Sequence, residues 1–283
     1  MSDSVLDGPR LGKRDFDTLS DLIEKHAGIR MPASKRTMLE GRLRRRLKEC
    51  GMNNFDQYCR FLFKDGGLDD ELTNLIDVVT TNKTEFFREP GHFEFLTRRI
   101  VPDLMHRGIG VQRPLRVWSA ACSTGPEPYT LAMVLSEVRA AIPGFDFHIL
   151  ATDISTSVLR AAARAIYPEA MAEPIPLELR KKYLLRSRDR TAGRIRMAPE
   201  IRNKVEFRHL NFMDPDYRLQ PAQDVVFCRN VLIYFDNDVR KTVLTRICRY
   251  IPTAGYLVVG HSETLGNIEL PVKQVVPTIY LRS

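Results

Sequence analysis

Three segments of this chain each combine a short apolar run, an end in small or polar residues, and a following helical pattern. They read RVWSAACSTGPEP, ILATDIS and DVVFCRNVLIYF, at residues 116–128, 149–155 and 224–235. Buried parallel strands have this pattern, because helices cover both faces of their sheet and functional residues follow the carboxyl ends. The alternation predicts an α/β fold with a mainly parallel sheet.

The turn after the first of these strands, Ser119–Gly125, narrows the choice of cofactor. It contains a single glycine, and the chain has no GxxxxGK[ST] motif. Cβ atoms would crowd a pyrophosphate there, which argues against a dinucleotide, and a P-loop is excluded. Asp153 ends the second strand and is placed to accept the hydroxyls of a ribose. The turn therefore favours S-adenosylmethionine, which has no phosphate. Glu127 suits its ammonium group, or is simply a favourable acid in the first turn of a helix.

The N-terminal part has no strand pattern and carries the positive charge. Leu39, Leu43 and Leu47 recur at helical spacing, which predicts an all-helical domain. The chain has a net charge of +8, and the stretch from Arg30 to Lys48 contains eight basic residues and one acidic residue. Such an excess favours acidic partners, although most charge runs are solvated faces. The stretch has no interleaved aromatic residues for stacking on bases.

Several classes of protein are disfavoured by composition. The five cysteines are scattered without a CxxC pair, and the six histidines show no HxxxH spacing. We therefore expect no disulfide framework and no bound metal. There is no apolar run long enough to span a membrane and no secretory signal pattern. We expect a cytoplasmic protein.

Five ordered segments, TTNKTEFFRE, RVWSAACSTGPEPYTLA, ILATDIS, HLNFMD and FCRNVLIYFD, resemble the CheR family of chemotaxis receptor glutamate methyltransferases. The resemblance implies a Rossmann-like S-adenosylmethionine-dependent methyltransferase domain with an inserted small β-subdomain, preceded by an all-α domain. It implies a helical receptor-recognition domain at 10–78, a linker contributing to the cofactor site at 79–90, and the methyltransferase domain at 91–283. The inserted subdomain is expected at 171–204.

The resemblance also implies which residues bind the cofactor. They are Asn82, Thr84, Arg88, Glu127, Asp153, Asn211, Phe212, Arg229 and Asn230. Arg88 would pair with the carboxylate of the cofactor, Phe212 would flank its adenine, and Asn230 would lie beside the reacting methyl group. Taken alone, residues 80–90 would be interpreted as an interdomain linker and Phe212 as a core aromatic residue.

The expected reaction needs few catalytic groups. A glutamate carboxyl, with a pKa of about 4.3, is already an anionic nucleophile at neutral pH, so no general base is required. An arginine could hold the acceptor carboxylate, and Arg229 is the first candidate, with Arg107, Arg113 and Arg116 as weaker ones. Tyr234 either lines the opening of the pocket that receives this carboxylate or packs under the following helix.

The resemblance implies that the protein transfers methyl groups to receptor glutamates, giving methyl esters and S-adenosylhomocysteine. The expected partner is the helical cytoplasmic domain of a chemotaxis receptor, bound by a monomer without nucleic acid or membrane insertion. Candidate receptor-binding residues are Arg42, Arg45, Arg46, Lys48, Arg194 and Arg196. Two alternatives stay open: a nucleic-acid methyltransferase, and a non-catalytic, cofactor-binding regulator that docks on receptors.

Overall fold

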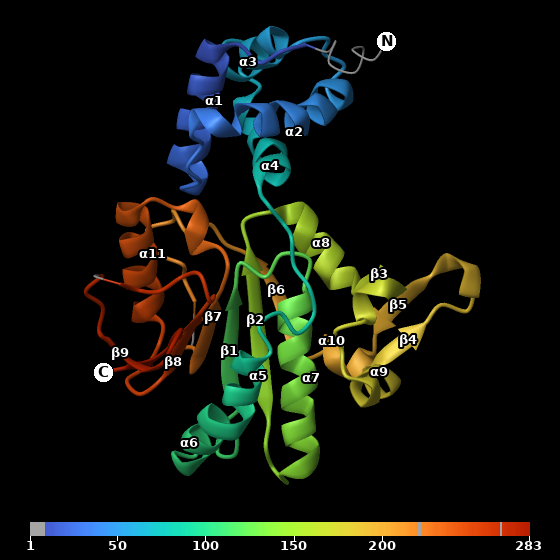
Figure 1. Ribbon diagram of the computed structural model, residues 1–283, viewed down its shortest axis with the longest axis vertical. Helices are drawn as coiled ribbons and strands as arrows, with labels where there is room; N and C mark the ends of the chain where they lie inside the picture. The colour runs from blue at the N-terminus through green and yellow to red at the C-terminus, as the bar shows by residue number, and fades with distance from the viewer. Residues whose placement is uncertain (1–8, 220–221, 267) are drawn as a thin grey trace. The chain divides into compact units, whose positions relative to one another are not determined.

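The computed structural model of the chain describes residues 9–219, 222–266 and 268–283 (Figure 1). The chain divides into two compact units. The first runs to Thr81 and includes Tyr234–Asp236, and the second consists of Asn82–Ile233 and Asn237–Ser283. Within the described residues, no helix combines the length and the apolar character that crossing a membrane requires.

The first unit is built from helices. They are α1 (Lys13–Ala27), the 3₁₀ turn η1 (Ala33–Lys35), α2 (Arg36–Glu49), α3 (Phe55–Phe63) and α4 (Leu68–Val79). Leu39, Leu43 and Leu47 are buried, so the stripe seen in the sequence is the core face of α2. Gly28 ends α1 with φ of 70°, a left-handed conformation that favours glycine. The prediction of an all-helical N-terminal domain is confirmed.

The second unit contains a seven-stranded sheet in the order β6-β2-β1-β7-β8-β10-β9. The strands are β1 (Leu115–Ala120), β2 (Phe147–Asp153), β6 (Val205–His209), β7 (Val225–Cys228), β8 (Tyr256–Val259), β9 (Val272–Val276) and β10 (Ile279–Arg282). The first five in the sheet order pair in parallel, whereas β10 is antiparallel to both its neighbours. β1 lies in the interior of the sheet, between β2 and β7. The three strands singled out in the sequence therefore end at one edge of the sheet.

Helices alternate with these strands, as the sequence predicted. In chain order they are α5 (Gly91–Phe95), the π-helical turn η2 (Leu96–Ile100), α6 (Val101–His106), α7 (Pro126–Ala141), α8 (Thr156–Arg164), η3 (Glu169–Ala172), α9 (Leu177–Tyr183), η4 (Arg190–Ala192), α10 (Pro199–Arg202), η5 (Leu232–Tyr234) and α11 (Asn237–Arg249). The long helix α7 packs against β2, and α8 packs against β2 and β6. The predicted Rossmann-like α/β arrangement is confirmed.

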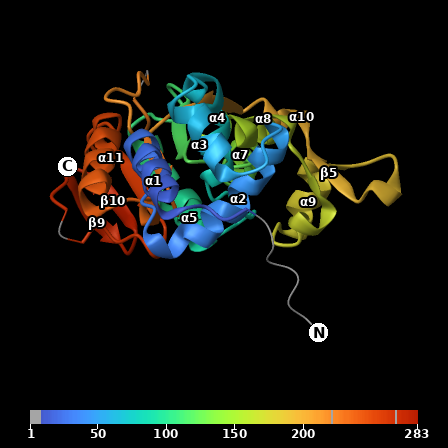
Figure 2. The same ribbon diagram turned by 90° about the horizontal axis from the view of Figure 1, so that it is seen from above.

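A second, antiparallel sheet has the order β3-β5-β4. Its strands are β3 (Ile166–Pro168), β4 (Leu184–Arg186) and β5 (Arg194–Met197). The inserted β-subdomain is thus present, and its sheet also takes in β3, which lies before the range 171–204 expected from the sequence. Figures 1 and 2 both show β5 on the side of the unit away from α11.

The C-terminal tail corrects one expectation. Its alternating pattern predicted a single edge strand over 273–282, but the structure has the hairpin β9–β10. Pro277 cannot donate a ladder hydrogen bond, and Thr278 has φ of 67°, so the chain turns there. β10 lies between β8 and β9 in the sheet, and β9 is the edge strand.

Candidate functional site

The turn after β1 is bonded to the end of β2 at the carboxyl edge of the sheet. The two strands are parallel, with Ala120 paired to Thr152. The N–H of Ser123 donates to Oδ2 of Asp153 over 2.8 Å, and the N–H of Ser155 donates to Oδ1 over 3.0 Å. These bonds hold the buried Asp153 carboxylate at the edge where ligands bind in open α/β sheets.

The glycine of this turn is required by close packing. Gly125 has φ of 100°, and a Cβ atom there would lie 2.8 Å from the hydroxyl oxygen of Tyr167 and 3.0 Å from Cβ of Ala162. The Tyr167 hydroxyl also donates to the carbonyl of Thr124 over 2.7 Å. Gly125 therefore serves the contact of the turn with α8 and β3.

Arg229 follows β7 and connects three segments. Its side chain is 1% exposed. Nη1 donates to Oε2 of Glu127 over 3.0 Å, while Nη2 donates to Oε2 of Glu89 over 3.0 Å and to the carbonyl of Arg88. The guanidinium carbon lies 5.4 Å from the ring centroid of Phe93, within the range of a cation–π contact. The end of β7 is thereby bonded to the start of α7 and to residues 88–89.

The two carboxyl groups bonded to Arg229 are stabilised to different degrees. Burial raises the pKa of Glu127, and this effect exceeds the opposing effects of Arg229 and of the Ser119 hydroxyl, which donates to Oε1 over 2.7 Å. Burial acts in the same direction on Glu89, but Arg229 and Asn230 help to lower its pKa below the usual value. A second cation beside Glu127 would stabilise its ionised form.

Residues 82–90, which we call the strap, run to the same edge. The Ser123 hydroxyl donates to the carbonyl of Asn82 over 3.0 Å. The N–H of Phe87 donates to Oγ1 of Thr130, on α7, over 3.2 Å. The strap is therefore bonded both to the turn after β1 and to α7.

The strap is also packed into the core through one aromatic ring. Phe86 is fully buried, and its ring centroid lies 5.1 Å from that of Tyr167. Thr84 and Arg88 are half-buried, and the Arg88 guanidinium donates to the carbonyl of Lys83 over 3.4 Å. Contacts of Thr84 and Arg88 with a cofactor stay a prediction.

The expected adenine residues follow β6, which pairs in parallel with β2. The N–H of Leu210 donates to the carbonyl of Asp153 over 3.0 Å, so the chain leaves β6 beside that residue. Asn211 and Phe212 are both buried, and Oδ1 of Asn211 accepts from the N–H of Met213 over 2.9 Å. The structure thus brings both residues to the carboxyl edge that holds Asp153.

Asn230 is held by two carboxylates. It has φ of 59°; its N–H donates to Oε2 of Glu263 over 2.6 Å, and Nδ2 donates to Oε1 of Glu89 over 3.2 Å. Glu263, fully buried after β8, also accepts from the N–H of Leu232 over 2.7 Å. Sequence reasoning did not identify Glu89. No local signal could have, because the groups that donate hydrogen bonds to its carboxylate lie 140 residues or more along the chain.

Three other arginines considered for the acceptor carboxylate are not brought to this edge. Arg113 precedes β1 and Arg116 lies near its start, at the amino end of the strand. Arg113 donates to both carboxylate oxygens of Asp224, over 2.8 and 2.6 Å. Arg107 donates to Asp103 over 2.7 Å. Arg107, Arg113 and Arg116 are therefore dropped as candidates.

Tyr234 groups with the first unit, although it lies six residues beyond the end of β7. Its carbonyl accepts from the N–H of Arg30 over 2.9 Å, and the Lys35 ammonium lies 5.8 Å from its ring centroid. A place for Tyr234 at a reaction site stays a prediction.

Two of the candidate receptor-binding arginines on α2 form hydrogen bonds within the helical unit. Arg46, 13% exposed, donates to both oxygens of Glu71 over 2.7 and 2.6 Å, and the Tyr58 hydroxyl donates to the same carboxylate over 2.9 Å. Arg42 donates to the carbonyls of Val79 and Thr80 at the end of α4. Both guanidinium groups therefore satisfy groups within the unit, and their contact with a receptor stays a prediction.

The other basic candidates are exposed. The Arg45 side chain is 81% exposed and pairs with Glu49, and Lys48 is also exposed. On β5, Arg194 and Arg196 are exposed while the residues alternating with them are buried. Because β5 is the central strand of its sheet, a partner would meet the face that carries these arginines.

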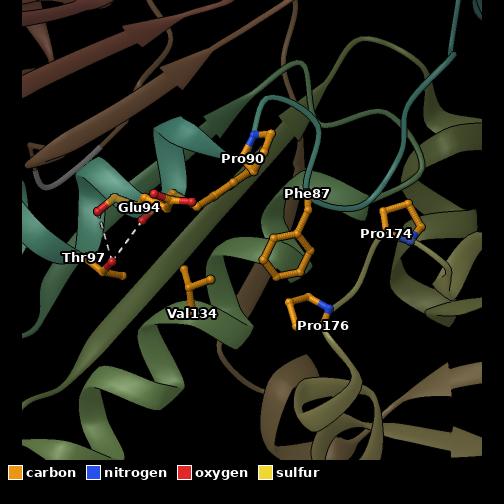
Figure 3. A pocket seen from close by; sticks show the side chains of 8 residues that line it. Phe87, Pro90, Glu94, Thr97, Val134, Pro174 and Pro176 are labelled. Carbon is orange, nitrogen blue, oxygen red and sulfur yellow. Dashed lines mark hydrogen bonds between the residues drawn. The ribbon is translucent and has the colours of Figure 1, made fainter.

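A separate cavity of about 410 Å³ lies beside the strap (Figure 3). It is lined by Phe87, Pro90, Phe93, Glu94, Thr97, Val134, Pro174 and Pro176. Figure 3 shows Phe87 and Pro176 close to each other, with Glu94 and Thr97 on the other side. None of the residues predicted to bind the cofactor lines this cavity, and we assign no ligand to it.

One group of side chains in the described residues has metal-ligand chemistry. Ligand atoms of Glu89, His92 and His261 all lie within 4.8 Å of one another. Nδ1 of the buried His92 is 3.4 Å from Oε2 of Glu89, and burial lowers the pKa of His92 to about 4. Because that oxygen already accepts from the Arg229 guanidinium, we assign no metal ion to the group.

Comparison with known proteins covers both units. The family model described as "CheR methyltransferase, all-alpha domain" matches residues 14–80, and "CheR methyltransferase, SAM binding domain" matches residues 82–280. The chain is 38% identical to a chemotaxis protein methyltransferase of Borreliella burgdorferi, covering 96% of this chain and 95% of that protein. It is 36% identical to chemotaxis protein methyltransferase 2 of Pseudomonas aeruginosa, covering 95% and 92%. It is also 36% identical to the chemotaxis protein methyltransferase of Escherichia coli K12, covering 92% and 87%.

Proposed function

Because the chain belongs to the CheR methyltransferase family, and is an S-adenosylmethionine-dependent chemotaxis protein methyltransferase, we propose that its acceptors are the γ-carboxylates of receptor glutamates. The observation that carries the proposal is the match of both family models, over residues 14–80 and 82–280. Each methyl ester would remove one negative charge from a receptor helix bundle and shift its signalling equilibrium.

The cofactor is proposed to lie at the carboxyl edge, held by Asn82, Thr84, Arg88, Glu127, Asp153, Asn211 and Phe212, with Asn230 beside its reacting methyl group. The raised pKa of Glu127 supports this arrangement, because its carboxylate would gain from the cofactor's ammonium group. The position of the Asp153 carboxylate at the end of β2 supports its assignment to a ribose.

When bound, S-adenosylmethionine supplies an electrophilic methyl group on a sulfonium. A glutamate carboxylate would already be the nucleophile toward that methyl group, so no residue of the chain would have to remove a proton. The chain's task is to align the acceptor and to exclude water. We assign Arg229 a positioning role, because its two terminal nitrogens already bond Glu89 and Glu127.

We propose a different role for each domain and for the linker. Residues 10–78 would recognise the receptor, 79–90 would contribute to the cofactor site, and 91–283 would carry the cofactor. The partner would be the helical cytoplasmic domain of the receptor, which places the enzyme, as a monomer, in the cytoplasm. Arg45 and Lys48 are the receptor-binding candidates on α2, and the face of β5 is the candidate for a receptor's C-terminal peptide.

A labelled methyl-transfer assay against receptor-containing membranes tests the acceptor. We expect base-labile label on protein that is released as methanol, which identifies a carboxyl ester. Label on RNA that resists base would favour a nucleic-acid methyltransferase. Binding of S-adenosylhomocysteine without transfer to any receptor would favour the non-catalytic regulator.

Replacing Asp153 with Asn tests the cofactor site. Loss of the charged acceptor should weaken S-adenosylhomocysteine binding by about 1.5–3 kcal/mol, the scale of a hydrogen bond to a charged group. Calorimetry measures the affinity. Asp146→Asn is a matched control, because this residue precedes the same strand at its opposite end, where it pairs with Lys204. Equal affinities for the Asp153 variant and the wild type would refute the ribose assignment.

Reversing the two exposed charges of α2 tests receptor docking. The double variant Arg45→Glu with Lys48→Glu should have a higher Michaelis constant for receptor. Each reversed charge should weaken the apparent binding free energy by about 0.2–1 kcal/mol. Raised salt should reduce the difference from the wild type, because it screens exposed charges. Lys13→Glu with Lys25→Glu, on exposed positions of α1, is the control. Wild-type kinetics of the α2 double variant at low salt would mean that this face is merely solvated.

A further inference from the structure

Glu89, on the strap, is a largely buried carboxylate that is bonded to two other segments of the chain. Its side chain is 13% exposed. Oε2 accepts from Nη2 of Arg229 over 3.0 Å and from the N–H of His261 over 3.3 Å, and Oε1 accepts from Nδ2 of Asn230 over 3.2 Å. The strap is thus bonded through one side chain to the end of β7 and the end of β8.

The chemistry of these partners requires a carboxylate. All of them are donors, and they approach both oxygens. A glutamine would present one acceptor and one NH₂ group, so it would set a donor against either Arg229 or Asn230, whichever way it turned. An aspartate is shorter by one methylene and would draw both oxygens away from their partners.

The bond to Asn230 determines how that amide is turned. With Nδ2 donating to Glu89, the amide oxygen of Asn230 is turned away from that carboxylate. The backbone of Asn230 is held independently, because its N–H donates to Glu263 over 2.6 Å. Glu89 therefore sets the orientation of the side chain, while Glu263 sets the position of the backbone.

The strap does not depend on Glu89 for its attachment. Phe86 is fully buried against Tyr167, and the Ser123 hydroxyl holds the carbonyl of Asn82 over 3.0 Å. Loss of the Glu89 contacts should leave these anchors in place. Effects on the end of β7 can therefore be separated from effects on the strap.

We propose that Glu89 is a positioning residue for methyl transfer, which acts by orienting Asn230 and Arg229 at the end of β7. The inference rests on the proposed function, in which Asn230 lies beside the reacting methyl group. It follows that turnover and cofactor affinity should respond differently to a change at Glu89. Turnover depends on the two acceptor oxygens of Glu89, whereas cofactor affinity is set mainly by Asp153, Glu127 and the strap.

The test is Glu89→Gln in the full-length enzyme, assayed with receptor-containing membranes. We expect kcat to fall about ten- to a hundred-fold, the scale of losing a hydrogen bond to a charged group. The Kd for S-adenosylhomocysteine should stay within about two-fold of the wild type, because the strap is attached by contacts that do not involve Glu89. Glu94→Gln is the matched control, since this exposed carboxylate lies five residues further along the chain, in α5. It should change neither quantity.

A double-mutant cycle identifies the residue through which Glu89 acts. If Glu89 orients Asn230, the effects of Glu89→Gln and Asn230→Ala on kcat should be strongly non-additive. Glu89→Asp serves the same comparison if the glutamine variant does not fold. Wild-type kcat in the Glu89 variants, additive effects in the cycle, or a parallel loss of kcat, affinity and melting temperature would each overturn the inference. A wild-type enzyme that labels no receptor would instead overturn the proposed function.

Discussion

Replacing Arg229 with Ala is expected to destabilise the α/β unit by about 3–5 kcal/mol, because it leaves two largely buried carboxyl groups without their cation. The Arg229 side chain is 1% exposed, and it bonds Glu89 and Glu127 over 3.0 Å each. Urea denaturation followed by circular dichroism measures the change in the free energy of unfolding. Arg208→Ala is the control, because its pair with Glu206 is solvent-exposed and should contribute about 1 kcal/mol or less.

The loss in the Arg229 variant should depend on pH in a defined direction. Without the guanidinium, burial raises the pKa of Glu89 and Glu127 in the folded state above the unfolded value. The folded state then binds protons more readily than the unfolded state, so its stability falls as pH rises through the folded pKa. The deficit should be largest at neutral pH and shrink on acidification. A deficit that is constant between pH 5 and 8 would mean that packing, not charge, accounts for it.

Replacing Arg46 with Glu is expected to destabilise the helical unit by a similar amount, about 3–5 kcal/mol, because it sets a second carboxylate against the buried Glu71. Glu71 is 5% exposed on its side chain and accepts from Arg46, Tyr58 and Asn74. Thermal unfolding measures the effect. Calorimetry with S-adenosylhomocysteine should show that the α/β unit still binds. Arg45→Glu, at an 81% exposed position one residue away, should cost about 1 kcal/mol or less.

The wild-type pair should also lose its contribution in acid. Burial tends to raise the pKa of Glu71, but bonds from Arg46, Asn74 and Tyr58 lower it below the ordinary value of 4.5. A carboxyl group with a depressed folded pKa contributes stability that is present above its unfolded pKa and lost as pH falls through the folded value. An Arg46 variant that folded as stably as the wild type, yet methylated receptor poorly, would reverse our assignment and restore Arg46 to the docking surface.

Much of the α/β unit could be predicted because its signals are local. The apolar runs of β1, β2 and β7 are buried on both faces, so each strand can be recognised from its own residues, without knowledge of its neighbours. Asp153 and Glu127 could be located for the same reason, since each follows a strand or turn at short range. The tail failed as a prediction because β9 and β10 alternate in the same way as one longer strand would.

The sequence alone determined the family, the α/β alternation, the helical N-terminal domain and the residues expected at the carboxyl edge. The tertiary structure decided how the charges are paired. Arg229 meets Glu127 and Glu89, which lie 102 and 140 residues away, and Arg46 meets Glu71 on another helix. A charged side chain looks the same in a sequence whether it faces water or a buried partner. That distinction depends on which segments the fold brings together, and it separates the structural arginines Arg42, Arg46 and Arg229 from the exposed Arg45.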